Sequence, residues 1–99
     1  MFCRTYAVPA GGATSVADLI EDDLPDYLAA QPTVGGGGFR SDIIIQSPAT
    51  NGNNVLLGDS VEQALVITAG GSSGQFRTSL NNLFVRGTAG DTVVIFLSF

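Results

Sequence analysis

The last eight residues, from Thr92 to Phe99, read as a β-strand that is apolar on both of its faces. Side chains alternate along a strand, so Val93, Ile95, Leu97 and Phe99 point one way while Val94 and Phe96 point the other. Antiparallel sheets commonly keep one face in water, and a strand of this kind therefore needs a second cover, from a helix or a neighbouring subunit. The pattern indicates assembly rather than catalysis.

Other predicted strands repeat this two-faced pattern. In each, two apolar residues share one face, and the apolar residue between them points to the opposite, second face. The predicted helical segment could cover a few of the second-face side chains, but these span several strands, so partner burial is the expected complement. The predicted interface residues are Ile44, Leu56, Val66, Phe84, Val94 and Phe96.

The composition favours one mainly β domain. The chain has 99 residues, of which 44% are hydrophobic and 13 are glycine, so it can bury one modest core between many turns. The predicted fold is an antiparallel β-sandwich or a jelly-roll-like module with a short helical N-terminal leader.

The run of four glycines at 35–38 has the composition of a linker and divides the chain into two predicted parts. Residues 1–38 are expected to hold a strand at 2–8 and short helices near 16–23 and 25–30, and to act as an arm or a cover. Residues 39–99 are expected to form the β-sandwich module.

Within the second part, turn-forming residues predict two hairpins. The first joins strands at 39–46 and 54–57, and the second joins strands at 83–86 and 92–97. Further strands are expected at 64–68 and 75–78.

Catalytic chemistry is not predicted, because the chain has no His and no Lys. Neither Ser60 nor Cys3 therefore has a credible base, zinc ligands are lacking, and Cys3 is expected to be buried. A carboxylate-only mechanism is the one enzymatic route left, and it ranks last. The acidic residues between Asp18 and Asp26 follow a helical pattern rather than a calcium loop, so no metal and no cofactor are predicted.

The charge pattern also limits the partners. Nine acidic residues face four scattered arginines, which does not favour nucleic acid. The sequence predicts neither a secretory leader nor a membrane span.

Two blocks carry a resemblance to a known group of proteins. Asn53-Asn54-Val55-Leu56-Leu57-Gly58-Asp59 and the segment from Asn82 to Val94, NLFVRGTAGDTVV, resemble small β-sandwich virion proteins of tailed bacteriophages, over residues 41–97. The resemblance implies a β-sandwich that serves as a capsid decoration or cement protein, or as a tail or fibre part.

The leading hypothesis is accordingly a virion structural protein that is made and assembled in the host cytoplasm. It would self-associate, with a trimer as the first expectation, and bind the major capsid protein or another virion protein as cement. The alternative is a receptor- or glycan-binding module of a tail or fibre, with loops 47–53 and 70–75 and the side chains of Gln75 and Phe76 making the contacts.

Overall fold

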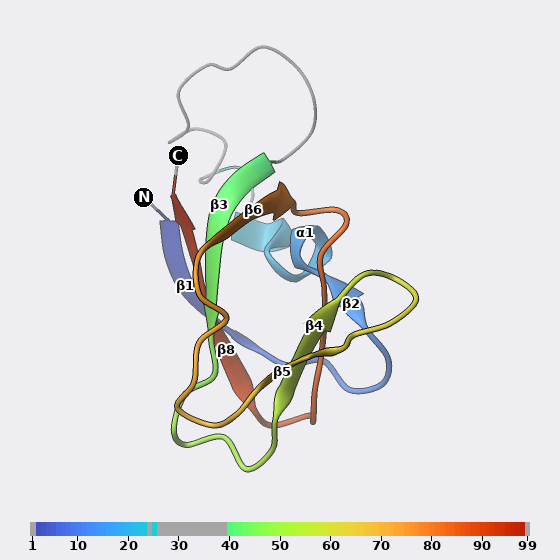
Figure 1. The fold of residues 1–99 in the computed structure, drawn as a ribbon, viewed down its shortest axis with the longest axis vertical. Helices are drawn as coiled ribbons and strands as arrows, with labels where there is room; N and C mark the ends of the chain where they lie inside the picture. The colour runs from blue at the N-terminus through green and yellow to red at the C-terminus, as the bar shows by residue number, and fades with distance from the viewer. Residues whose placement is uncertain (1, 24, 26–39, 99) are drawn as a thin grey trace.

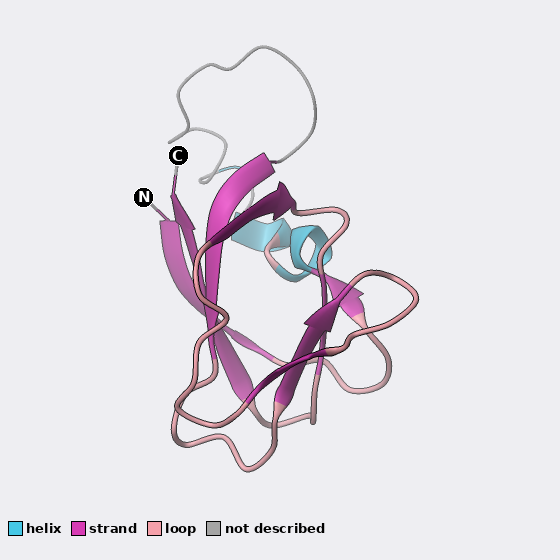
Figure 2. Ribbon diagram, viewed as in Figure 1, coloured by secondary structure: helices cyan, strands magenta, loops and turns pink. Residues whose placement is uncertain are grey.

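The computed structural model describes residues 2–23, 25 and 40–98, and these residues form a mainly β structure with little helix (Figures 1 and 2). The elements are β1 (Phe2–Ala7), β2 (Thr14–Ser15), α1 (Val16–Leu19), the 3₁₀ turn η1 (Glu21–Asp23), β3 (Arg40–Gln46), β4 (Val55–Gly58), β5 (Leu65–Ile67), β6 (Phe76–Ser79), β7 (Phe84–Arg86) and β8 (Thr92–Ser98). Seven of these strands confirm sequence-based predictions; the two-residue β2 was not predicted.

The strands form two four-stranded antiparallel sheets, an arrangement consistent with a β-sandwich. One sheet, here called the β8 sheet, has the order β1-β8-β3-β6, and the other, the β4 sheet, has the order β2-β7-β4-β5. The pairs are nested: the first strand pairs with the last, the second with the seventh, the third with the sixth and the fourth with the fifth.

Both predicted hairpins are wrong. Strand β3 pairs with β6 and β8, and β4 pairs with β5 and β7, so the segment at 47–54 crosses from one sheet to the other. The segment at 87–91 crosses in the same way between β7 and β8. Turn-forming residues mark a change of direction, but they do not determine which strand the chain pairs with afterwards.

The core lies between the two sheets and follows the predicted alternation. Val93, Ile95 and Leu97 are completely buried, as are Ile43 and Ile45 on the neighbouring strand β3. The β4 sheet contributes inward-facing side chains to the same cluster, namely Val55, Leu57, Ile67 and Val85. These side chains, predicted to share the first face of their strands, are therefore confirmed to point into the core.

The N-terminal helix is shorter than predicted. Ser15 caps α1 by accepting a hydrogen bond from the Asp18 backbone N–H at 3.1 Å, but the α-helix ends at Leu19 and only η1 follows. The carboxylates of η1 lie where a continued helix would have its C-terminal end, and negative charge is unfavourable at that end of the helix dipole. Figure 2 shows this helical segment, in cyan, at one end of the two sheets. The helix expected at 25–30 lies outside the described residues, apart from Pro25.

The N-terminal segment is built into both sheets. β1 pairs with β8 over six residues, β2 pairs with β7, and Val16 of α1 and the C-cap residue Ile20 are fully buried in the core. Residues 2–23 therefore share one hydrophobic core with residues 40–98. The predicted boundary at 38/39 lies outside the described residues.

Candidate functional site

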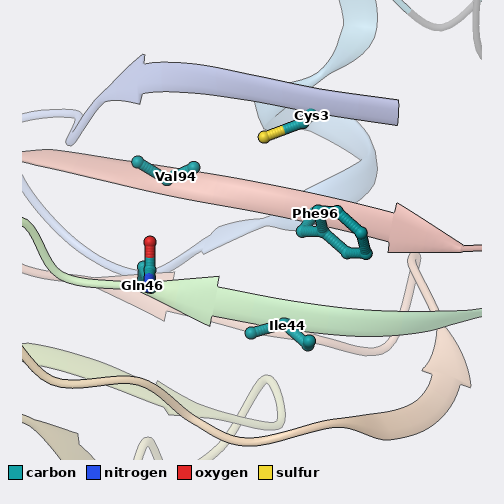
Figure 3. Close-up of a pocket in the computed structure, with 5 residues that line it drawn as sticks. All are labelled: Cys3, Ile44, Gln46, Val94 and Phe96. Carbon is teal, nitrogen blue, oxygen red and sulfur yellow. The ribbon is translucent and has the colours of Figure 1, made fainter. Parts of the chain in front are cut away.

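The outer face of the β8 sheet carries a shallow hollow of about 160 Å³ (Figure 3). Strand β8 lies between β1 and β3, and each of the three strands contributes to the lining. Phe96 is in register with Cys3 on one side and with Ile44 on the other. The lining residues are Cys3, Ile44, Gln46, Val94 and Phe96.

Three predicted interface residues meet here: Ile44, Val94 and Phe96, called the β8 patch below. Each is partly exposed, whereas the residues that alternate with them are buried in the core. The apolar character of this face is therefore not needed to fill the interior. The three side chains remain partly accessible to solvent.

The structure places the other three predicted residues on the outer face of the β4 sheet. Leu56 and Val66 are cross-strand partners on β4 and β5, and Phe84 lies on β7, in register with Gly58. Leu56 and Phe84 are partly exposed, and Val66 is 52% exposed. The six residues thus form two separate patches, because the two sheets turn their outer faces away from each other. Leu56, Val66 and Phe84 are called the β4 patch.

The chemistry of the hollow on the β8 sheet is that of an apolar contact surface. Its lining holds no charged residue, and Gln46 supplies one amide. Cys3 is exposed, contrary to the expectation of a buried thiol, because β1 is an edge strand and position 3 falls on its outward-facing side. The ion pair of Arg77 Nε with Asp42 Oδ1, at 3.6 Å, connects β6 and β3 of the same sheet and is solvent-exposed.

A second hollow, of about 130 Å³, was not predicted. It is lined by residues of β4, β5 and β6 and by Leu83, just before β7, namely Leu57, Gly58, Leu65, Phe76 and Leu83. Nothing local in the sequence shows that β5 and β6 leave an opening. Only the sheet order, which makes both of them edge strands, reveals it.

The loops predicted to contact a glycan do lie together. The Ser47 N–H donates to the Gly71 carbonyl at 3.0 Å, and the Gly70 N–H donates to the Ser47 carbonyl at 2.7 Å. Gln75 is exposed, but Phe76 is partly buried and packs against the core. The ring expected to stack on a sugar is therefore turned inward.

The acidic residues of the N-terminal segment lie on and after the short helical turns. Asp18, Glu21 and Asp22 are exposed, while Asp23 accepts a hydrogen bond of 2.8 Å from the Tyr6 hydroxyl. Burial, helped by this bond and by the charge of Asp23, raises the pKa of Tyr6 above its ordinary value. No group of three or more His, Cys, Asp or Glu side chains suited to a metal ion occurs among the described residues.

Asp59 organises the loop between β4 and β5. Its Oδ1 accepts hydrogen bonds from the backbone N–H groups of Val61 and Glu62, both at 2.8 Å, and these bonds lower the pKa of the carboxyl. The side chain of Val61, at the tip of this loop, is 90% exposed. A fixed turn thus presents an apolar side chain to the solvent.

No family model, curated protein or solved structure matches this chain. The described part of the chain also contains no helix that is long and apolar enough to cross a membrane. The class that the structure defines is an antiparallel β protein of two sheets with apolar outer patches.

Proposed function

We propose that this protein is a structural component of a bacteriophage virion, a self-associating decoration or cement protein that stabilises the capsid shell. The observation that carries the proposal is the β8 patch, where Ile44, Val94 and Phe96 remain partly exposed around a hollow without charged residues. Full burial of an apolar side chain contributes about 1.5–3 kcal/mol, so covering this patch would favour association. The sequence resemblance to virion proteins, over residues 41–97, supplies the biological setting.

The finer fold that we propose is a jelly roll with a short helical leader. The nested pairing of the strands supports it, because an eight-stranded jelly roll is one long antiparallel hairpin rolled into two sheets. Jelly rolls occur in viral capsid domains and in lectins, which fits both candidate functions but does not choose between them. The surface residues, rather than the fold, must distinguish the two candidate functions.

The proposed partners are other copies of the chain, in a trimer, and the major capsid protein or another virion protein. Nucleic acid does not fit, because the net charge is −5 and the arginines are scattered in the sequence. The proposed location is the mature virion, after assembly in the host cytoplasm.

The test compares Phe96→Asp with Ala10→Asp, which adds the same charge at an exposed loop position away from both patches. Sedimentation velocity measures self-association, and co-sedimentation with purified empty capsids of the parent phage measures shell binding. We expect the wild type and Ala10→Asp to associate and bind, and Phe96→Asp to lose shell binding and the self-association that depends on the β8 patch, while its circular dichroism spectrum stays that of a folded β protein. Wild-type protein that remains monomeric and ignores capsids would contradict the proposal.

A second candidate is a receptor- or glycan-binding module of a tail or fibre. The observation that favours it is the pairing of loops 47–53 and 70–75 through Ser47, Gly70 and Gly71. It ranks second because Phe76 packs against the core instead of offering a stacking surface. Reproducible binding on a glycan array that is lost in Gln75→Ala would place it first.

A further inference from the structure

The large hydrophobic side chains that are most exposed in the described part of the chain lie close together in the sequence. Val61 is 90% exposed, Leu65 is 49% exposed and Val66 is 52% exposed. All three fall between the tip of the Asp59 loop and strand β5. Such a concentration of exposed apolar side chains marks an interaction surface.

Strand β5 is also an edge of its sheet. It pairs with β4, and no other described strand pairs with its second side. An edge strand offers its outward backbone N–H and C=O groups to any strand that arrives in register. The apolar side chains therefore accompany a backbone that can accept one more strand.

The other edges carry features that discourage such pairing. Strand β1 contains Arg4, whose guanidinium lies 5.0 Å from the ring of Phe2, and β6 contains Arg77, which pairs with Asp42. Strand β2 has two residues and continues directly into α1. Charged side chains and short strands are devices by which proteins protect sheet edges; β5, with three residues, is short as well, but it carries no charge.

The charge pattern identifies the occupant. The chain carries a net charge of −5, which opposes the association of two copies, yet no charged residue occurs between Glu62 and Arg77. Strand β5 itself therefore adds no like-charge repulsion between two copies, and the nearest acidic residues, Asp59 and Glu62, lie in the loop before it. The β5 strand of a second copy is uncharged, extended and apolar, and such a strand would suit this edge. An antiparallel strand can pair with its own copy about a two-fold axis, so the surface is self-complementary.

We propose that β5 is a homotypic pairing edge, at which two copies join their β4 sheets into one continuous antiparallel sheet across a two-fold axis. The Val66 side chains of the two copies lie on the same outer face of that sheet. Leu65 faces the hollow with Leu57, Phe76 and Leu83, and the partner strand covers its exposed side. This contact is separate from the β8 patch, and it is two-fold, so it does not depend on the proposed trimer.

The first test introduces a charge at the edge. Val66→Lys places two like charges close to each other across the axis, and Ala10→Lys is the matched control at an exposed loop position. We expect Val66→Lys to raise the dimer dissociation constant, measured by sedimentation velocity, by at least about tenfold. Ala10→Lys should leave it unchanged, and thermal melting should show that both variants fold. A Val66→Lys variant that dimerises like the wild type would overturn the proposal.

The second test locates the axis. In a Cys3→Ser background, single cysteines are placed at Val66 in β5 and at Ala64 and Thr68 on either side of the strand, all exposed, with Ala10→Cys as the control. Under mild oxidation, disulfide-linked dimers should form fastest at the position closest to the axis and more slowly on either side. Equal yields at all four positions would overturn strand pairing.

The two proposals can fail separately. If Phe96→Asp abolishes self-association and Val66→Lys does not, the β8 patch is the interface and the β5 edge is not. If Val66→Lys removes a dimer that Phe96→Asp retains, the edge contact stands whether or not the protein binds capsids.

Discussion

The side chain of Asn51 bonds to both backbone polar groups of Thr92, a residue 41 positions further along the chain. Its Nδ2 donates to the Thr92 carbonyl at 2.7 Å, and its Oδ1 accepts from the Thr92 N–H at 2.9 Å. The same Nδ2 donates to Ser47 Oγ at 2.9 Å. Asn51 thus binds the first residue of β8 as a neighbouring strand would, and it joins the two segments that cross between the sheets.

Asn51→Ala should therefore destabilise the fold more than an ordinary loop substitution does. Asn51 is 8% exposed, and its removal leaves the Thr92 N–H and C=O without these partners in a partly buried place. We expect the free energy of unfolding, measured with urea, to fall by about 1–3 kcal/mol. Asn54→Ala, at an exposed position of the same crossing segment, should change it by less than about 0.5 kcal/mol. Equal effects of the two substitutions would contradict this role.

Gly58→Ala should also destabilise the protein, because Gly58 faces the turn that follows β4. A Cβ at this position would meet the Glu62 carbonyl oxygen and would lie 2.6 Å from Gln63 Cα, and both contacts are with backbone. The Asp59 loop must then shift, at a cost of about 1–3 kcal/mol. Gly12→Ala is the control, because a Cβ there has no atom within 4 Å. Thermal melting of the two variants compares them directly.

Tyr6→Phe tests the link between β1 and η1. Removing the hydroxyl breaks the hydrogen bond to Asp23 and should cost about 1 kcal/mol near neutral pH. Because the pKa of Tyr6 is raised in the folded protein, the Tyr6 hydroxyl ionises first in the unfolded chain, around its ordinary pKa of 10.0, as the pH rises. The stabilisation is thus complete below that pH and is lost as the pH rises beyond it.

Urea unfolding of both proteins between pH 7 and pH 11 measures this effect. The stability difference between wild type and Tyr6→Phe should be constant at the lower values and should shrink above about pH 10. Tyr27 is present in both proteins, so its contribution cancels as long as it is unaffected by the substitution. A difference that grows at alkaline pH would contradict the assigned hydrogen bond.

Two neighbours on β8 separate folding from assembly. Ile95 is completely buried between the sheets, so Ile95→Ala should lower the free energy of unfolding by about 2–5 kcal/mol. Phe96 is partly exposed on the outer face, so Phe96→Ala should cost the isolated chain less and should weaken self-association more. Unfolding should be measured at low protein concentration and association at high concentration. A reversed order of the two effects would mean that the inner and outer faces have been misassigned.

The strands were largely readable from the sequence. Period-two alternation and turn residues located β1 and all of the strands from β3 to β8, because both signals are local properties of the chain. The inward set on β8 and β3 was also correctly assigned. The helix predicted near 16–23 is only partly present: Val16 and Ile20 are buried in the core, but the α-helix ends at Leu19, before the acidic residues of η1.

The site was less predictable. The alternation identified which side chains face outward, but it could not show that Ile44, Val94 and Phe96 gather on one sheet while Leu56, Val66 and Phe84 lie on the other. It also gave no sign that Cys3 would be exposed beside Phe96, because that depends on β1 being an edge strand in register with β8.

The sequence by itself determined where strands form and which of their side chains seek the interior, since both follow from neighbouring residues. The tertiary structure decided which strands pair. Ser47 to Asn54 and Gly87 to Asp91 have turn chemistry that suits a hairpin, yet both cross between the sheets. Pairing β8 with β1 and β3 brings together residues far apart in the chain and buries their inner face, and local turn preferences carry no information about that gain.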